Sequence, residues 1–271
     1  MPELPEVETT RKGIEPHLLG QRISRVMVRQ PRLRWPIPKD LPALLKGRKV
    51  GAVGRRGKYL LIGFRHGHLL IHLGMSGSLR VLDATSPPQK HDHLDLCLSD
   101  GRCLRLRDPR RFGAVLWTDD PPDQHPLLAS LGPEPLSEIF DGAYLHRQGM
   151  NRRSAIKNLI MDSHVVVGVG NIYASESLFR AGIHPSRGSN RISLTRYQAL
   201  AEAIRSVLTE AIAQGGTTLR DFQQEDGRPG YFAQQLQVYG RAGDPCPECG
   251  KPVLSRVIGQ RSSFFCSHCQ H

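Results

Sequence analysis

The hydrophobic pattern divides the chain into a strand-rich first part and a helix-rich second part. Between residues 23 and 118, short apolar or alternating runs are separated by turn-forming residues. These runs lie at 23–28, 59–64, 69–73, 94–98, 104–106 and 113–118. Alternation with a period of two is typical of strands, and many short strands of this kind indicate a β-sandwich or barrel.

The hairpin around Ser99-Asp-Gly101 has a register that its leucines constrain. Leucines alternate over 94–98 before it and over 104–106 after it. A two-residue turn would put the two sets on opposite faces, whereas a three-residue loop with a left-handed Gly101 puts them on one face. The sequence therefore favours the longer loop, which sets Cys97 opposite Cys103 as two reduced thiols.

After a proline-rich stretch at 119–126, the apolar spacing becomes helical. Helices are expected over about 141–148, 154–161, 172–181 and 194–214, the last followed by Gly215 as a C-cap. A short amphipathic helix is expected over 7–18, and Pro16 should end it early. The pattern as a whole predicts an α+β chain of two domains, a β-sandwich followed by a helical domain.

The first residues offer an uncommon nucleophile. Pro2 stands next to Glu3, and the basic and apolar regions of a signal peptide are missing. If Met1 is removed, Pro2 carries a secondary α-amine, which titrates near about 8 and is partly unprotonated at neutral pH. Its attack on an aldehyde-level carbon gives an iminium, an electron sink. The plainer interpretation is a helix start, because Pro5 suits a first helical position and the acidic residues suit the helix dipole.

The charge of the chain adds a class of partner. Its 271 residues include 37 Lys and Arg against 25 Asp and Glu, a formal net charge of +12. The excess recurs in separate patches at 29–34, 55–58, 105–111 and 152–153, which favours a nucleic-acid surface over ordinary solvated charge. No stretch is long and apolar enough for a membrane span, and without a targeting segment a reducing cytosol is expected.

Four of the six cysteines form a metal-binding pattern. Cys246-Pro-Glu-Cys249 and Cys266-Ser-His-Cys269 are two C-x-x-C pairs with 16 residues between them. This spacing predicts one structural Zn²⁺ held by four thiolates, with no open position for a catalytic water, whereas two disulfides or idle thiols are the alternative. His268 is interpreted as a non-ligand. The hairpin between the pairs carries Arg261, which can reach a phosphate backbone.

Other motifs are ambiguous on the residues alone. The glycines before Asn171 suit either an anion site at a helix N-terminus or a plain helix–helix turn. Met75 and Phe112 follow strands, where each can wedge into a base stack, although such side chains more often belong to a core. Lys58 stands at a strand start, where it is either a site residue or, as is usual for a lone lysine, a solvated surface residue.

Taken together, the motifs resemble those of one family, the bacterial formamidopyrimidine-DNA glycosylases. The resemblance runs from Pro2 to about Gln270, in the family's order. It rests on Pro2-Glu-Leu-Pro-Glu-Val-Glu8, Lys58-Tyr-Leu-Leu, His72-Leu-Gly-Met-Ser-Gly, Lys90-His-Asp-His, Asp108-Pro-Arg-Arg-Phe-Gly, Val167-Gly-Val-Gly-Asn-Ile-Tyr-Ala-Ser-Glu, Gln214-Gly-Gly-Thr-Thr-Leu, Gly230-Tyr-Phe-Ala and the ribbon cysteines. The start of the chain is more similar to this branch than to endonuclease VIII, which shares the architecture and prefers oxidised pyrimidines.

The resemblance implies a bifunctional glycosylase and abasic-site lyase of base excision repair. Such an enzyme removes 8-oxoguanine and formamidopyrimidines from duplex DNA and then cuts the strand by β,δ-elimination. The catalytic roles fall on Pro2 as the nucleophile at C1′, Glu3 as acid and base, Lys58 in β-elimination and Arg261 in δ-elimination. The rivals are a non-enzymatic zinc-ribbon DNA-binding protein of the same fold and an endonuclease VIII-like glycosylase.

The resemblance also implies how the chain meets its partner, damaged double-stranded DNA. DNA contacts fall on His91, Arg110, Arg152 and Asn171, and the trio that fills the gap left by the flipped nucleotide is Met75, Arg110 and Phe112. The implied domains are a catalytic β-sandwich at 1–119, a linker at 120–136, a helix–two-turns–helix domain at 137–235 with a lesion-capping loop at about 215–235, and a zinc ribbon at 236–271. A monomer without a membrane contact is expected, in the bacterial cytoplasm and at the nucleoid while it acts.

Overall fold

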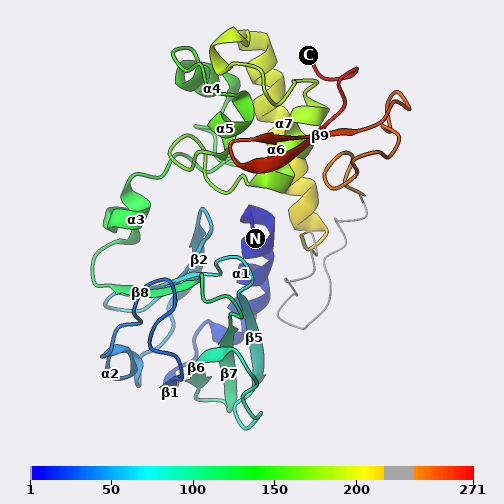
Figure 1. Ribbon diagram of the computed structural model, residues 1–271. Helices are drawn as coiled ribbons and strands as arrows, with labels where there is room; N and C mark the ends of the chain where they lie inside the picture. Colours follow the sequence, from blue (N-terminus) through cyan, green and yellow to red (C-terminus); the bar gives the residue numbers. More distant parts are fainter. Residues whose placement is uncertain (1, 217–234) are drawn as a thin grey trace. The chain divides into compact units, whose positions relative to one another are not determined.

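The computed structural model describes residues 2–216 and 235–271, and most of the predicted lesion-capping loop lies outside them (Figure 1). The described residues form two compact units, 2–129 with 214–216 and 130–213 with 235–271. The division falls inside the predicted linker at 120–136, and the other domain limits stay predictions. None of the helices in the described residues combines the length and apolar character that a membrane crossing requires.

The first unit contains two antiparallel sheets of four strands each. One has the order β1 (Ile23–Val28), β6 (Asp92–Leu98), β7 (Arg102–Arg107) and β5 (Ser78–Asp83), and the other has the order β2 (Ala52–Arg56), β3 (Tyr59–Gly63), β4 (His68–His72) and β8 (Ala114–Thr118). Apolar side chains from both sheets meet in one buried core. The predicted β-sandwich is confirmed.

The β6–β7 hairpin has the predicted register. Leu96 pairs with Leu104 and Cys97 with Cys103, and Gly101 has a φ of 89°. The loop is therefore the three-residue type, which keeps the leucines of both strands in the core. Cys97 and Cys103 are buried, and neither is in a disulfide.

Helix α1 (Leu4–Leu18) packs against β2, β3 and β5, and it differs from the prediction at its start and at Pro16. It begins three residues earlier than expected, and it runs through Pro16, so the predicted early end is wrong. Pro16 lies in the last turn, between the fully buried Ile14 and Leu18. Burial of two such side chains at about 1.5–3 kcal/mol each offsets the roughly 3 kcal/mol cost of an internal proline.

Short elements that the pattern did not predict connect these parts. They are α2 (Leu41–Leu45), the 3₁₀ turn η1 (Pro122–Gln124) and α3 (Pro126–Ala129). The last two lie in or beside the proline-rich stretch. Prolines at their first positions, Pro122 and Pro126, fix φ near the helical value and lose no hydrogen bond there.

The second unit is helical and ends in a two-stranded ribbon (Figure 1). Its elements are α4 (Gly142–Gly149), α5 (Ile156–Met161), α6 (Asn171–Arg180), the 3₁₀ turn η2 (Ser189–Arg191), α7 (Leu194–Ala213), β9 (Leu254–Ile258) and β10 (Arg261–Phe265). The four predicted helices are confirmed to within two residues at each end. Gly215 has a φ of 75°, the left-handed conformation expected just after α7.

Candidate active site and nucleic-acid interface

The start of α1 holds Pro2 and Glu3 in buried positions. Glu3 is the N-cap, and its amide donates a hydrogen bond of 2.8 Å to Glu6 Oε2 within a capping box. Gly216 lies against the same carboxylate, since a Cβ on Gly216 would approach Glu6 Oε1 to 3.0 Å. The helix-start interpretation is therefore correct, and the helix start also fixes the two residues that the resemblance makes catalytic.

The turn that carries Lys58 is tied to this helix. Gly57 and Lys58 join β2 to β3, and Arg55 Nη1 donates to Gly57 O at 2.9 Å. Arg55 Nε donates to Glu8 Oε2 at 3.0 Å. Burial by itself would raise the pKa of Glu8, but hydrogen bonds from Arg11 and Arg55 outweigh it and hold that pKa below its ordinary value. An ionised Glu8 thus links the helix of Pro2 to the turn of Lys58.

His72, which lies near Lys58, is a residue to which the sequence analysis assigned no role. Its Nδ1 accepts the Gly74 N–H at 3.0 Å, which leaves the proton of the neutral ring on Nε2, and its ring lies 4.8 Å from that of Tyr59. Burial, Lys58 and Arg34 lower the pKa of His72 to about 4. The available signal was a histidine at the end of an apolar strand, directly before the Leu-Gly-Met motif.

Asp108 joins the two loops that carry the predicted wedge residues. Its fully buried carboxylate accepts Ser76 Oγ–H at 3.1 Å and the Gly113 N–H at 2.8 Å. Ser76 follows Met75, and Gly113 follows Phe112. The backbones of the loops also touch, since a Cβ on Gly74 would lie 2.4 Å from Gly113 N. The structure thus brings Met75 and Phe112 onto adjoining loops.

Exposure of the wedge residues fits contact with a ligand. Phe112 is 46% exposed, unlike a core phenylalanine. The Arg110 guanidinium lies 5.0 Å from the centre of its ring. Met75 is half-buried, and His91 is half-buried at the end of an exposed loop. The four DNA-contact residues that were predicted in the first unit therefore all lie at or near its surface.

In the second unit, a buried lysine brings Asn171 and the ribbon together. Lys157, which is fully buried, donates from Nζ to Asn171 Oδ1 at 2.6 Å, to Ser263 Oγ at 2.6 Å and to Ser262 O at 3.2 Å. Asn171 Nδ2 also donates to Ser262 O at 3.0 Å. Arg261 is the exposed neighbour of Ser262, so two predicted site residues share one support.

Arg152 lies apart from that support. Its exposed side chain pairs with Asp162 at 3.2 Å, in the segment between α5 and α6. An exposed pair of this kind contributes little to stability, so the guanidinium is available to an anionic ligand at small cost.

The four ribbon cysteines form a cluster of the size that zinc requires. All four Sγ atoms lie within 4.8 Å of one another, with Cys246–Cys269 at 3.9 Å and Cys249–Cys266 at 3.5 Å. Tetrahedral Zn²⁺ with bonds of about 2.3 Å separates its sulfurs by about 3.8 Å, so the donors fit one structural zinc. His268 is exposed and 3.1 Å from Lys251 Nζ, outside the cluster, as predicted.

Comparison with known proteins shows which family the chain belongs to. Family models match residues 1–115 (formamidopyrimidine-DNA glycosylase N-terminal domain), 131–223 (the H2TH domain of the same enzymes) and 243–271 (zinc finger found in FPG and IleRS). The formamidopyrimidine-DNA glycosylases of Thioalkalivibrio sulfidiphilus and Syntrophotalea carbinolica are 62% and 60% identical over 270 residues, and both chains are covered completely. The chain belongs to the formamidopyrimidine-DNA glycosylase family.

Solved structures of this family have the same fold. The MutM (FPG) protein of Thermus thermophilus is 42% identical, with a TM-score of 0.89 over 99% of this chain and 98% of that one. Lactococcus lactis Fpg in a complex with DNA containing an abasic site is 32% identical, with a TM-score of 0.91 over 99% of each chain. The family, the α+β fold and the zinc that the sequence predicted are confirmed.

Proposed function

We propose that the protein is a DNA glycosylase of base excision repair that removes oxidised purines and then cleaves the abasic strand. The placement of Pro2 and Glu3 carries the proposal. Both are buried before α1, and Glu8 and Arg55 link that helix to the turn of Lys58. Relatives of about 60% identity bear the name formamidopyrimidine-DNA glycosylase, and the Lactococcus lactis relative is described in a complex with a Fapy-dG containing DNA.

Base removal starts at the amine that loss of Met1 exposes. The Pro2 nitrogen attacks C1′ of the damaged nucleotide and the N–C1′ bond forms. The base leaves with the electrons of the glycosidic bond and takes up the proton that the Pro2 nitrogen loses. Glu3 then donates a proton to the ring oxygen, so that the bond from this oxygen to C1′ breaks and a cationic iminium forms.

Strand cleavage uses the iminium as an electron sink. Loss of the C2′ proton converts the iminium into an enamine. The electrons of the enamine then expel the 3′ phosphate in the β-elimination and restore a conjugated iminium. A second elimination expels the 5′ phosphate, and water then releases Pro2 from the sugar. Lys58 and Arg261, as fixed cations, stabilise the departing phosphates.

DNA contacts come from both units in this proposal. His91, Arg110, Arg152 and Asn171 hold phosphates, and Met75, Arg110 and Phe112 occupy the gap that a flipped nucleotide leaves. Because the substrate is chromosomal DNA, the protein would work in the bacterial cytoplasm, at the nucleoid while it acts.

Borohydride trapping tests the enzyme. Reduction of the iminium should join the protein covalently to a duplex containing 8-oxoguanine, in a yield that Glu3→Gln lowers at least tenfold while it still binds DNA. Intact mass establishes beforehand that Pro2 is the first residue. If processed protein binds the duplex but forms no adduct, the non-enzymatic rival is correct, and faster cleavage of an oxidised-pyrimidine duplex would favour the endonuclease VIII-like one.

A further inference from the structure

The loop that leads to His91 is held by charged side chains rather than by apolar packing. Residues 87–90 of this loop are exposed. Beside them lies a pocket of about 260 Å³, lined in part by Arg80, Arg105 and Arg107. Since little apolar surface anchors the loop, its shape depends on the polar contacts beneath it.

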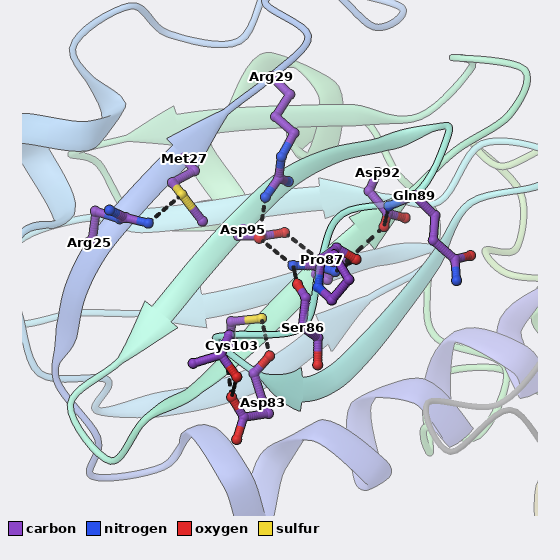
Figure 2. A network of polar contacts seen from close by, with 12 residues as sticks. Arg25, Met27, Arg29, Asp83, Ser86, Pro87, Gln89, Asp92, Asp95 and Cys103 are labelled. Carbon is purple, nitrogen blue, oxygen red and sulfur yellow. Dashed lines mark hydrogen bonds and ion pairs between the residues drawn. The ribbon is translucent and has the colours of Figure 1, made fainter.

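Arg105, on β7, supplies most of these contacts. Its side chain is 4% exposed, and it donates from Nε and Nη2 to the two oxygens of Asp95 at 2.9 and 2.8 Å. The same guanidinium donates to Ser86 O at 3.0 Å and to Pro87 O at 3.3 Å. Figure 2 shows Ser86 and Pro87 close to Asp95, which Arg29 approaches from another side. The start of the loop is thus fixed to the sheet.

Asp92 extends this support to the end of the loop. Its Oδ2 is 3.6 Å from Arg105 Nη1 and accepts the Gln89 N–H at 2.7 Å, a pair seen in Figure 2. The Asp92 N–H in turn donates to Gln89 O at 3.1 Å. Residues 89–92 therefore form a closed turn, with Lys90 and His91 at its centre.

His91 has a backbone conformation that needs such a support. Its φ is 76°, in the left-handed region that side chains with a Cβ rarely adopt. A strained residue of this kind persists only where its surroundings hold it, and such residues concentrate at binding sites. The Asp108 N–H donates to His91 O at 3.0 Å on the far side of the turn, so both flanks of His91 are fixed.

We infer that Asp92, backed by Arg105 and Asp95, is a positioning residue that presents His91 to the DNA. The inference rests on the proposed function, in which His91 contacts the phosphate backbone of the DNA. Asp92 itself does not touch the ligand; it acts through the turn.

A double-mutant cycle tests the inference. Asp92→Ala should weaken binding to a duplex with a tetrahydrofuran abasic analogue about tenfold, the scale of one charge-assisted hydrogen bond. His91→Ala should weaken binding by the same factor, and the double variant should bind no more than twofold more weakly than His91→Ala. Asp92→Asn, which keeps an oxygen for Gln89 N–H, should restore most of the affinity.

The control is Asp83→Ala. Asp83 also accepts an N–H in a neighbouring turn, from Thr85 at 2.8 Å, and its loss changes the net charge equally. Loss of negative charge alone should tighten binding to DNA, so only a positioning role predicts the weaker binding of Asp92→Ala. In that variant Arg105 keeps Asp95 and two carbonyls, and unchanged urea midpoints would show that the fold survives.

Four outcomes separate the inference from the proposed function. The positioning role would be overturned if Asp92→Ala lowered the DNA affinity equally in the wild-type and His91→Ala backgrounds. It would also be overturned if Asp92→Ala bound DNA within twofold of wild type. If wild-type protein excises 8-oxoguanine but His91→Ala binds normally, the positioning role is wrong and the glycosylase stands. If wild-type protein binds but excises nothing, the proposed function fails, and the binding cycle still decides whether Asp92 acts through His91.

Discussion

His72 shows how one residue acquires its properties from contacts distant in the sequence. A histidine in water is about half charged near pH 6.5, but this one is enclosed beside two cations, and its pKa falls to about 4. It stays neutral at physiological pH, with Nδ1 bound to Gly74 and a proton on Nε2. It is therefore a hydrogen-bond donor beside Lys58 that adds no charge to the site.

The lowered pKa of His72 predicts a pH dependence of stability. Above about pH 6.5, His72 is neutral in both the folded and the unfolded protein. Between about pH 6.5 and pH 4, His72 binds a proton in the unfolded protein but not in the folded protein. Stability is therefore lost as pH falls through this window, by up to about 3 kcal/mol. Urea unfolding at pH 7.5 and 4.5 should show a smaller loss for His72→Gln than for wild type. The exposed His66→Gln is the control, and equal losses in both variants would contradict the prediction.

Single residues were predictable where their partners are local in sequence. The zinc cysteines come in two pairs of near neighbours, so spacing alone defined the site. Lys157 was not predictable, because its burial depends on Ser262 and Ser263, more than a hundred residues later. At Pro2 the residues alone allowed two interpretations, a nucleophilic amine or a plain helix start, and only the resemblance favoured the first, since ten residues at a chain start look the same whether they cap a helix or also react.

Between elements, Lys157 joins α5, α6 and β10 through one ammonium group. Lys157→Met should leave Asn171 Oδ1 and Ser263 Oγ without their donor, which costs about 1–3 kcal/mol for a buried group. DNA binding should weaken as well, because Asn171 and the strand that begins at Arg261 lose their common support. Urea unfolding and titration with duplex DNA measure the two effects.

The control for Lys157→Met is an exposed lysine of the ribbon. Lys251→Met should change stability by less than about 0.5 kcal/mol, as surface substitutions usually do. A Lys157→Met protein that matched wild type in both stability and affinity would show that the ammonium supports neither element.

Elements were predictable where the core pattern allows one solution. The three-residue loop of the β6–β7 hairpin followed because any other register would expose leucines. The passage of α1 through Pro16 was not predictable, because the penalty at Pro16 is local whereas the burial of Ile14 and Leu18 depends on the sandwich. Strand β5 escaped notice because Ser78–Asp83 interrupts its apolar residues with an arginine and ends in a turn.

For the whole molecule, the net charge of +12 predicts binding that weakens with salt. Each phosphate contact releases counterions, so log Kobs decreases with log salt, and removal of one contact makes this slope less steep by about 0.9. Arg261→Gln should reduce the slope by that amount. Arg25→Gln removes the same charge from an exposed position on β1 and should reduce it far less. Equal slopes for the two variants would mean that general charge, not a contact at Arg261, governs binding.

The paired strands β6 and β7 also bear on how the molecule withstands its own working conditions. A protein that repairs oxidised DNA is needed when oxidants are abundant, and the thiolate is the form of cysteine that they attack. Burial and the nearby Asp95 raise the pKa of Cys103 to about 11. Near pH 7 only about one molecule in ten thousand therefore carries a Cys103 thiolate, so this thiol is chemically quiet inside the domain that handles oxidative damage.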